Sequence, residues 1–291
     1  MTTRSPDALS ITIWGARGSI PAPGPHTLRY GGETTCLEIR AGPHVVLIDC
    51  GSGARLCGAA FAKEGIEQVD VLFTHTHMDH LCGLPFFCSA YDPNVAVSLW
   101  AGHIPPGGTL EEIVERMMSP PIFPVATSAL RNTEFRSFNA RDTITLASGL
   151  EVASTRLNHP GNGCGYRIDW AGSSIAIITD HEHGDDLIDD AIAEFVTGAD
   201  LMIYDAMYLE DEYPKFVGWG HSTPTQALDL AARAGVAMPV MFHHDPSRGD
   251  DALDTLAREV TSQLPGAVVA TQGQTITLTA GKVEIGTSRA A

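Results

Sequence analysis

The sequence predicts an α/β protein in which two β-rich halves pack face to face with helices on the outside. Strand patterns alternate with helix patterns in both halves of the chain, as is typical of layered α/β folds. The apolar fraction of 44% is sufficient for a large core. The length of 291 residues is high for one domain, but no linker-like segment separates the halves. Residues 1–291 are therefore expected to form a single domain.

The first half begins with strands and then alternates strands with helices. Residues 10–14 alternate apolar and polar side chains, which is typical of a strand. Two further strand patterns are joined by the turn Ala41-Gly42-Pro43, which predicts a hairpin. A short helix is expected over residues 54–63. The expected strands of this half are residues 10–14, 35–40, 44–49, 69–73 and 95–100.

A segment over residues 102–135 breaks this rhythm. Residues 109–118 carry apolar side chains at helical spacing. Pro120, Pro121 and Pro124 then exclude both a helix and a central strand. The pattern predicts a proline-rich insert that lies over a pocket. A plain surface excursion is the alternative.

The second half repeats the pattern of the first. Its expected strands are residues 143–146, 151–157, 166–170, 174–179, 201–204 and 240–242. Its expected helices are residues 185–196, 224–234 and 252–264. Residues 275–279 and 282–285 are expected to close the chain as a hairpin.

The composition favours a cytoplasmic protein with a small substrate. There are 18 Lys and Arg residues against 35 Asp and Glu residues, a net charge of −17. This acidity argues against an extended nucleic acid, because polyanions are bound through many basic side chains. No apolar run is long enough for a membrane span, and no signal-peptide pattern is present. The six cysteines form no C-x-x-C pair and are expected to be reduced.

A glycine-rich loop over residues 15–21 follows the first strand pattern. It lacks the Lys-Ser/Thr pair of a nucleotide-binding P-loop, and no helix pattern follows it. Arg17 within this loop is a candidate for contact with an anionic substrate. A surface arginine without a functional role is the alternative.

A dense cluster of metal-binding residue types follows the strand over residues 69–73. The stretch His75-Thr76-His77-Met78-Asp79-His80 has three imidazoles and a carboxylate in six residues. Imidazole suits zinc and related transition metals, and carboxylate adds a charged ligand. His75 and His77 are spaced to face the same side at a strand end and bind one ion. Asp79 and His80 then point elsewhere, where they can bind a second ion.

Four further candidates lie at the ends of predicted strands. Asp49 ends a buried strand and is positioned to orient a neighbouring site. His159, Asp180 and His243 each follow an apolar strand. Strand ends in a layered α/β fold meet at one edge, where sites are built. His244 is a rival to His243, which is preferred because it follows Phe242 directly.

In this order, these residues resemble the five motifs of the metallo-β-lactamase superfamily. The resemblance implies an αββα four-layer sandwich with two divalent metal ions between the sheets. Zinc is the first choice, with manganese or iron as alternatives. The implied ligands of the first ion are His75, His77 and His159, those of the second are Asp79, His80 and His243, with Asp180 bridging and Asp49 orienting the cluster.

Two later stretches resemble the phosphodiesterase branch of that superfamily, which includes tRNase Z and small cyclic-phosphate phosphodiesterases. They are Tyr204-Asp205-Ala206-Met207-Tyr208 and Gly218-Trp219-Gly220-His221-Ser222-Thr223. In that branch a carboxylate holds a histidine that contacts the phosphate and assists the leaving oxygen. Here Asp205 stands in place of the usual Glu. The implied catalytic residues are His221, Asp205 and Asp79.

The resemblance implies a dinuclear metal-dependent hydrolase, and a phosphodiesterase acting through a metal-bound hydroxide is preferred. The expected substrate is a small phosphodiester, for which a cyclic phosphate is a reasonable candidate. The alternatives are a lactone, ester or β-lactam hydrolase, an RNA 3′-processing nuclease, and a redox or binding protein. The sequence lacks the basic, glycine-rich arm with which tRNase Z enzymes bind tRNA. A homodimer remains open.

Overall fold

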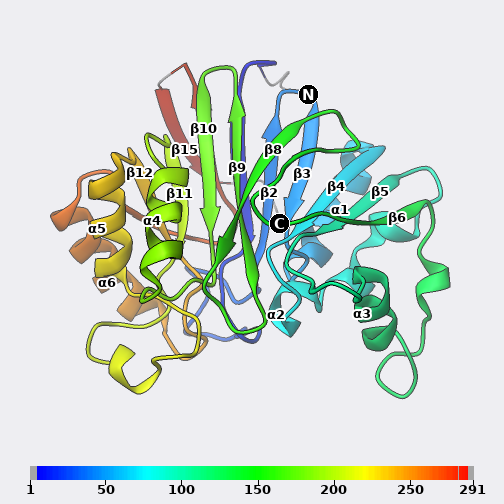
Figure 1. Cartoon of the computed structure of the whole chain (residues 1–291), viewed down its shortest axis with the longest axis horizontal. Helices are drawn as coiled ribbons and strands as arrows, with labels where there is room; N and C mark the ends of the chain where they lie inside the picture. Colours follow the sequence, from blue (N-terminus) through cyan, green and yellow to red (C-terminus); the bar gives the residue numbers. More distant parts are fainter. Residues whose placement is uncertain (1–4, 281, 288–291) are drawn as a thin grey trace.

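The computed structural model describes residues 5–280 and 282–287, and in this part of the chain two β-sheets pack face to face between two layers of helices (Figure 1). The first sheet has eight strands. From one edge to the other they are β15 (Lys282–Thr287), β14 (Gln274–Thr279), β1 (Leu9–Gly15), β2 (Cys36–Ala41), β3 (His44–Ile48), β4 (Gln68–Phe73), β5 (Ala96–Ala101) and β6 (Thr133–Ser137).

The second sheet has seven strands among the described residues. In order they are β13 (Val268–Val269), β12 (Met238–Phe242), β11 (Leu201–Asp205), β10 (Ser173–Ile178), β9 (Gly163–Trp170), β8 (Glu151–Leu157) and β7 (Thr143–Thr145). Both sheets join an antiparallel part to a parallel part. Strands β3 to β6 are parallel in the first sheet, and β10 to β13 in the second.

Helices cover the outer faces of both sheets (Figure 1). Those beside the first sheet are α1 (Ala54–Glu64) and α3 (Leu110–Met117), and those beside the second are α4 (Asp186–Phe195), α5 (Pro224–Ala234) and α6 (Asp250–Gln263). The short α2 (Met78–Leu81) follows β4. Single turns form η1 (Leu84–Phe86), η2 (Cys88–Tyr91), η3 (Thr127–Ala129) and η4 (Tyr213–Lys215).

Local sequence explains where the helices begin and end. The Thr223 hydroxyl accepts the backbone N–H of Gln226, and the Gln226 side-chain oxygen accepts the backbone N–H of Thr223. This capping box starts α5. Pro224 occupies the first turn of α5, where its missing N–H costs nothing. Gly235 ends α5 in the left-handed conformation that glycine adopts without strain.

Three apolar clusters hold the layers together. The largest lies between the sheets and includes Ile11 and Ile39 from the first sheet and Tyr166 and Ile177 from the second. The other two lie between each sheet and its own helices. This arrangement confirms the αββα sandwich. Within the described residues, each helix is too short or too polar to cross a membrane.

The proline-rich segment over residues 102–135 differs from the expectation. Leu110, Val114 and Met118 pack into the cluster between the first sheet and its helices. The segment ends in β6, which adds a parallel edge strand next to β5 and was not predicted. Helix α3 and strand β6 are therefore parts of the first helix layer and the first sheet, whereas the turn that contains Pro120, Pro121 and Pro124 is exposed, and its position over a pocket stays a prediction.

Candidate metal centre

The predicted ligands come from strand ends of both sheets. The stretch from His75 to His80 follows β4, and His159 follows β8. Asp180 and His243 follow β10 and β12. The structure brings these segments together at one end of the sandwich, near α2, which lies at the bottom of Figure 1. The site therefore lies across the junction of the two halves.

Three of these residues have an unusual backbone conformation. Asp49, Asp180 and His243 have φ angles of 60°, 56° and 61°. Non-glycine residues rarely adopt this left-handed region, and such strain concentrates at functional sites. Each follows closely on a buried strand and turns the chain sharply there. The strained turns direct the side chains toward one another across the ends of the sheets.

The first group of donors contains His75, His77 and His159. His77 Nδ1 lies 2.9 Å from His75 Nε2 and 3.1 Å from His159 Nε2. Burial lowers the pKa of His75 and His159, to about 4 for His159, and partial desolvation lowers the pKa of His77, which lies at the exposed edge of the group. The rings are therefore neutral, and each can offer a nitrogen lone pair to a cation.

The second group contains Asp79, His80, Asp180 and His243, which are all buried. His80 Nε2 lies 3.3 Å from Asp79 Oδ2 and 3.4 Å from His243 Nε2. Asp180 Oδ2 lies 3.3 Å from the Nε2 atoms of both His80 and His243. The same oxygen lies 3.7 Å from His75 Nε2 in the first group. Asp180 thus stands between the two groups.

This donor set fits two divalent cations. Ligand atoms about 2.0–2.1 Å from a tetrahedral zinc ion stand roughly 3.3 Å apart, close to the spacings in both groups. Burial alone would raise the pKa of Asp180 and Asp79, but the neighbouring imidazoles hold both pKa values below the usual range. Buried carboxylates that remain ionised require positive charge nearby. Two cations at these groups would supply it.

Hydrogen bonds on the outer side of the rings fix which nitrogen faces the centre. His80 Nδ1 lies 2.8 Å from Asp49 Oδ2, and His159 Nδ1 lies 2.9 Å from the Gly220 carbonyl. A proton on Nδ1 of each ring leaves the lone pair of Nε2 free to bind a metal ion. Asp49 is fully buried and also accepts bonds from the Thr74 backbone and hydroxyl. Asp49 is therefore placed to orient His80.

Adjacent histidines at the last motif have different surroundings. His243 Nε2 lies 3.2 Å from Asp79 Oδ2, whereas His244 Nε2 bonds the Ala270 carbonyl at 2.8 Å. The structure thus brings His243 rather than His244 into the metal groups. Gly18 closes the other side of His243, because a Cβ added there would lie 2.4 Å from its Nδ1. The close backbone approach explains a glycine in this loop, a role that the sequence did not reveal.

A second acid–imidazole pair stands beside the metal groups. The fully buried Asp205 has its Oδ2 2.7 Å from His221 Nδ1, and its Oδ1 accepts the backbone N–H of Met207. The separation of 2.7 Å is that of a charge-assisted hydrogen bond, and is too short to accommodate an ion between the atoms. The ring of His221 stacks on that of His243, with centroids 4.9 Å apart. His221 therefore lies beside the second group, with its Nδ1 4.0 Å from Asp180 Oδ2.

Arg17 does not occupy the expected position. Its side chain is fully buried, and the guanidinium donates to the carbonyls of Gly31 at 2.8 Å and Arg248 at 2.6 Å. A guanidinium enclosed in this way cannot reach a substrate, so the predicted contact is wrong for this structure. Arg17 instead ties the glycine-rich loop to the segment after β12.

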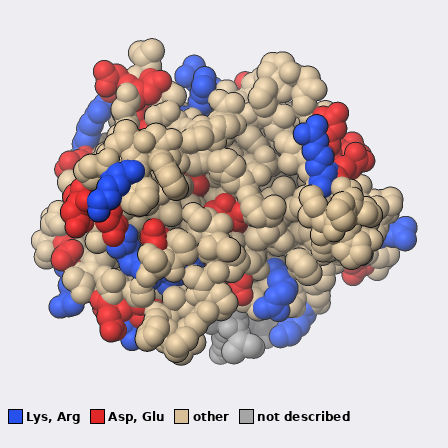
Figure 2. Space-filling view, turned by 90° about the horizontal axis from the view of Figure 1, so that it is seen from below, with Lys and Arg blue, Asp and Glu red and all other residues tan. Residues whose placement is uncertain are grey.

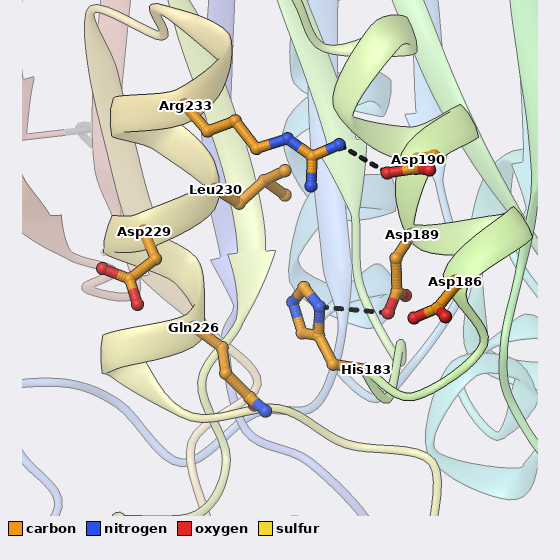
Figure 3. A pocket seen from close by; sticks show the side chains of 8 residues that line it. All are labelled: His183, Asp186, Asp189, Asp190, Gln226, Asp229, Leu230 and Arg233. Carbon is orange, nitrogen blue, oxygen red and sulfur yellow. Dashed lines mark hydrogen bonds and ion pairs between the residues drawn. The ribbon is translucent and has the colours of Figure 1, made fainter.

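A further imidazole group lies behind the metal centre, next to a pocket of about 440 Å³ between α4 and α5 (Figure 3). The ligand atoms of His181, His183 and Asp189 lie within 4.8 Å of one another. The Asn158 N–H donates to His181 Nδ1, so the proton of this ring is on Nε2, 3.0 Å from Asp189 Oδ1. The His181 ring is thus a hydrogen-bonded anchor with no nitrogen lone pair left for a metal.

The molecular face at this end has acidic side chains at its centre. Figure 2 shows a few Asp and Glu atoms there, while further acidic and basic side chains are spread over the rest of the face. Large basic fields are typical of proteins that bind long polyanions. The face shown in Figure 2 carries both acidic and basic side chains and displays no large basic field.

Comparisons with known proteins agree with this geometry. A family model described as "Beta-lactamase superfamily domain" matches residues 44–244, more than half of the chain. The Ribonuclease Z of Haloarcula marismortui is 24% identical over 313 residues, which cover 90% of this chain and 94% of that protein. The Ribonuclease Z of Mycobacterium bovis is 27% identical over 272 residues, with coverages of 83% and 88%.

Solved structures show the same fold. The metallo-β-lactamase fold protein YhfI from Bacillus subtilis has a TM-score of 0.69 at 18% identity, covering 96% of this chain and 100% of that one. A diphosphatase from the PhnP family has a TM-score of 0.67 at 20% identity, with coverages of 93% and 97%. Zn²⁺-bound PqqB from Methylobacterium extorquens has a TM-score of 0.66 at 17% identity, with coverages of 91% and 99%. The chain therefore belongs to the metallo-β-lactamase superfamily, and over most of its length it is similar to proteins named Ribonuclease Z.

Proposed function

We propose that the protein is a dinuclear metal phosphodiesterase whose substrate is a small phosphodiester, with a cyclic phosphate as the first candidate. The observation that carries this proposal is the Asp205–His221 pair. A buried carboxylate holds an imidazole 2.7 Å away, and that imidazole stacks on the proposed ligand His243. A phosphodiester with an alkoxide leaving group needs a proton donor at such a position.

The protein residues would divide between binding two cations and moving protons. The proposed ligands are His75, His77 and His159 for one cation and Asp79, His80 and His243 for the other, with Asp180 shared. Bound divalent cations would lower the pKa of a coordinated water and stabilise charge on the phosphoryl oxygens. Zinc is proposed because the donors are rich in imidazole and because the fold neighbour PqqB is Zn²⁺-bound.

His221 is the proposed proton donor to the leaving oxygen. Burial alone would lower the pKa of His221, but Asp205, assisted by Asp180 and Asp79, raises it to about 9. Two bound cations would oppose the effect of Asp180 and Asp79, so the direct pair with Asp205 has to maintain the protonated ring. As water attacks phosphorus, Nε2 gives its proton to the oxygen whose bond to phosphorus breaks. Asp79 can take the proton that the water loses. An open diester would give a monoester and an alcohol, whereas a cyclic phosphate would give one ring-opened product that carries both the monoester and the free hydroxyl.

The size of the substrate is proposed from charge. The chain has a net charge of −17, and the face over the site has acidic side chains at its centre (Figure 2). The diphosphatase of the PhnP family is a fold neighbour with a TM-score of 0.67. These observations favour a compact phosphate compound over a long polyanion.

RNA 3′ processing is the second candidate. It is favoured by the name Ribonuclease Z, which belongs to relatives aligned over 94% and 88% of their own length. The two candidates share the metal groups and the proposed proton donor. They differ in the substrate that must fit, so a direct comparison of substrates separates them.

The test combines a substrate panel with one variant. The panel contains 3′,5′-cyclic AMP, bis(p-nitrophenyl) phosphate, a precursor tRNA, a lactone and a β-lactam, each with metal-reconstituted protein. His221→Ala should lower kcat about 10²–10³-fold on cyclic AMP and less on bis(p-nitrophenyl) phosphate, whose aryloxide leaves without a proton. His26→Ala, at an exposed imidazole, is the matched control.

Three outcomes would change the assignment. Equal slowing of both diesters would make His221 a phosphate-binding residue rather than a proton donor. Fastest turnover of the precursor tRNA would favour the nuclease. Faster turnover of the lactone or the β-lactam than of every diester would overturn the phosphodiesterase proposal.

A further inference from the structure

Glu182 is a buried carboxylate that the proposed chemistry does not use. It lies two residues after Asp180 and is 6% exposed. Its Oε1 accepts the backbone N–H of Gly218 at 2.7 Å and the hydroxyl of Tyr213 at 3.1 Å. Its Oε2 accepts the backbone N–H of Gly220 at 2.7 Å. All three donors belong to the segment between β11 and α5, which carries His221.

The two glycines expose their N–H groups to this carboxylate because of their backbone conformation. Gly218 and Gly220 have φ angles of 89° and 91°, which other residues rarely adopt. The Gly220 peptide is bonded on both sides, since its N–H meets Glu182 and its carbonyl meets His159 Nδ1 at 2.9 Å. His221 is the next residue in the chain. The position of this one turn therefore determines the orientation of the proposed ligand His159 and the location of the proposed proton donor His221.

Glu182 is itself held from the opposite side. The neighbouring residue His181 donates to Asp189 Oδ1 on α4, and His183 faces the same aspartate in the pocket between α4 and α5 (Figure 3). The backbone N–H of Glu182 donates to the Asn158 carbonyl at 2.9 Å, and the Asn158 side chain donates to the Glu182 carbonyl at 2.8 Å. The carboxylate is thus presented from a fixed backbone toward the Gly218–Gly220 turn.

We propose that Glu182 is a positioning residue that acts through this turn on His221 and His159. Its charge-assisted bonds hold the Gly218–Gly220 backbone, so that His221 stays beside the metal groups and the Gly220 carbonyl orients His159. The effect on His221 rests on the proposed phosphodiesterase function. The effect on His159 concerns metal affinity and does not depend on the substrate.

Glu182→Gln is the most informative change. The amide keeps the shape of the side chain but replaces one acceptor oxygen with a donor, so one glycine N–H loses its partner. Because small displacements of catalytic groups are costly, kcat on cyclic AMP should fall about 10–10²-fold. The loss on bis(p-nitrophenyl) phosphate should be smaller, because that leaving group needs no proton. Tyr213→Phe removes only the third bond and is the matched control, with an expected change within about twofold.

A double-variant cycle tests whether Glu182 acts through His221. Wild type, Glu182→Gln, His221→Ala and the double variant are compared on both diesters. The metal is kept at saturating concentration, so that the effect on His159 does not contribute. If Glu182 works by placing His221, the double variant is then no slower on cyclic AMP than His221→Ala alone. Fully multiplicative losses would overturn the action through His221.

Chelator competition tests the action on His159 without any substrate. Glu182→Gln should lower the affinity for the metal ion that the chelator removes first by about 10-fold, because the orientation of the His159 ring is disturbed. His221→Ala and Tyr213→Phe should leave this affinity unchanged. Equal affinity in all four proteins would overturn this part of the proposal. Glu182→Asp, which keeps the charge on a shorter side chain, should lie between wild type and Glu182→Gln, and it replaces Glu182→Gln if that variant does not fold.

The result for His221→Ala separates a failure of the phosphodiesterase proposal from a failure of the proposed role of Glu182. If His221→Ala does not slow either diester, the proposed proton donor is wrong, and the chelator measurement still decides the role of Glu182. If His221→Ala slows cyclic AMP selectively and Glu182→Gln behaves like Tyr213→Phe in both measurements, the phosphodiesterase proposal stands and the inference about Glu182 is wrong.

Discussion

Alanine at Gly220 should damage the metal centre, whereas alanine at Gly218 should not. The two glycines share nearly the same backbone conformation, with φ angles of 91° and 89°. A left-handed alanine costs about 1–2 kcal/mol at either position. An added Cβ at Gly218 has no heavy atom within 4 Å, whereas at Gly220 it would lie 2.1 Å from His159 Nδ1. The pair therefore separates backbone strain from a direct contact with a proposed ligand.

The size of the effect follows from the contact. Real Cβ contacts are essentially never shorter than 3.0 Å, so Nδ1 has to retreat from 2.1 Å by about 0.9 Å. Such a movement breaks the 2.9 Å contact between His159 and the Gly220 carbonyl. Loss of an outer partner of a metal ligand typically costs about 10–100-fold in metal affinity or activity. Gly218→Ala should show only the backbone strain, a decrease in Tm of roughly 2–4 °C.

The assay is a chelator titration of the metal-loaded proteins, combined with thermal unfolding of the same samples. We expect Gly220→Ala to release one ion at a chelator concentration at least about tenfold lower than wild type and Gly218→Ala. Equal metal affinity for the two variants would refute the reasoning. It would mean that the approach of Gly220 to His159 does not control the ligand.

Three other predictions concern the ligand set and pH. Asp180→Ala should reduce the metal content from two ions toward one per chain, whereas His181→Ala should retain two, as measured by elemental analysis. His243→Ala should lose more metal and activity than His244→Ala, because only His243 Nε2 faces Asp79. Burial lowers the pKa of His103 from 6.5 to about 4. The unfolded chain therefore binds the extra proton as the pH falls from 6.5 to 4, and stability falls by up to about 3 kcal/mol. His103→Gln should remove that loss in urea unfolding of the metal-free protein.

Much of the layered fold could be predicted because the apolar residues within a short stretch of sequence indicate a buried strand. The apolar residues of β4 before His75 and the strands before Asp180 and His243 are buried in the structure. The ends of such strands meet at one edge, and the resemblance to the superfamily motifs then indicated which of these residues would be neighbours. The edge strand β6 was missed because two of its five residues are half-buried, the other three are exposed, and no alternating apolar face is present.

Contacts between side chains and distant backbone could not be predicted in the same way. The burial of Arg17 depends on carbonyl groups of Gly31 and Arg248, which lie 14 and 231 residues away. Glu182 binds N–H groups that any residue could offer, and only the left-handed turns at Gly218 and Gly220 present them to it. The sequence does not show which backbone group a side chain will bind, since nearly every residue carries the same backbone donor and acceptor.

The division of the proposed ligands between the two halves of the sandwich would make bound cations a cross-link. His75, His77, Asp79 and His80 come from the first half of the sandwich, and His159, Asp180 and His243 from the second. Each proposed cation would therefore have ligands from both halves and would connect them at one end of the sandwich. Binding energy for the native arrangement adds directly to the stability of the folded state. Removal of the metal should then open the sandwich first at the end that holds the chemistry, while the apolar cluster between the sheets keeps the remaining length closed.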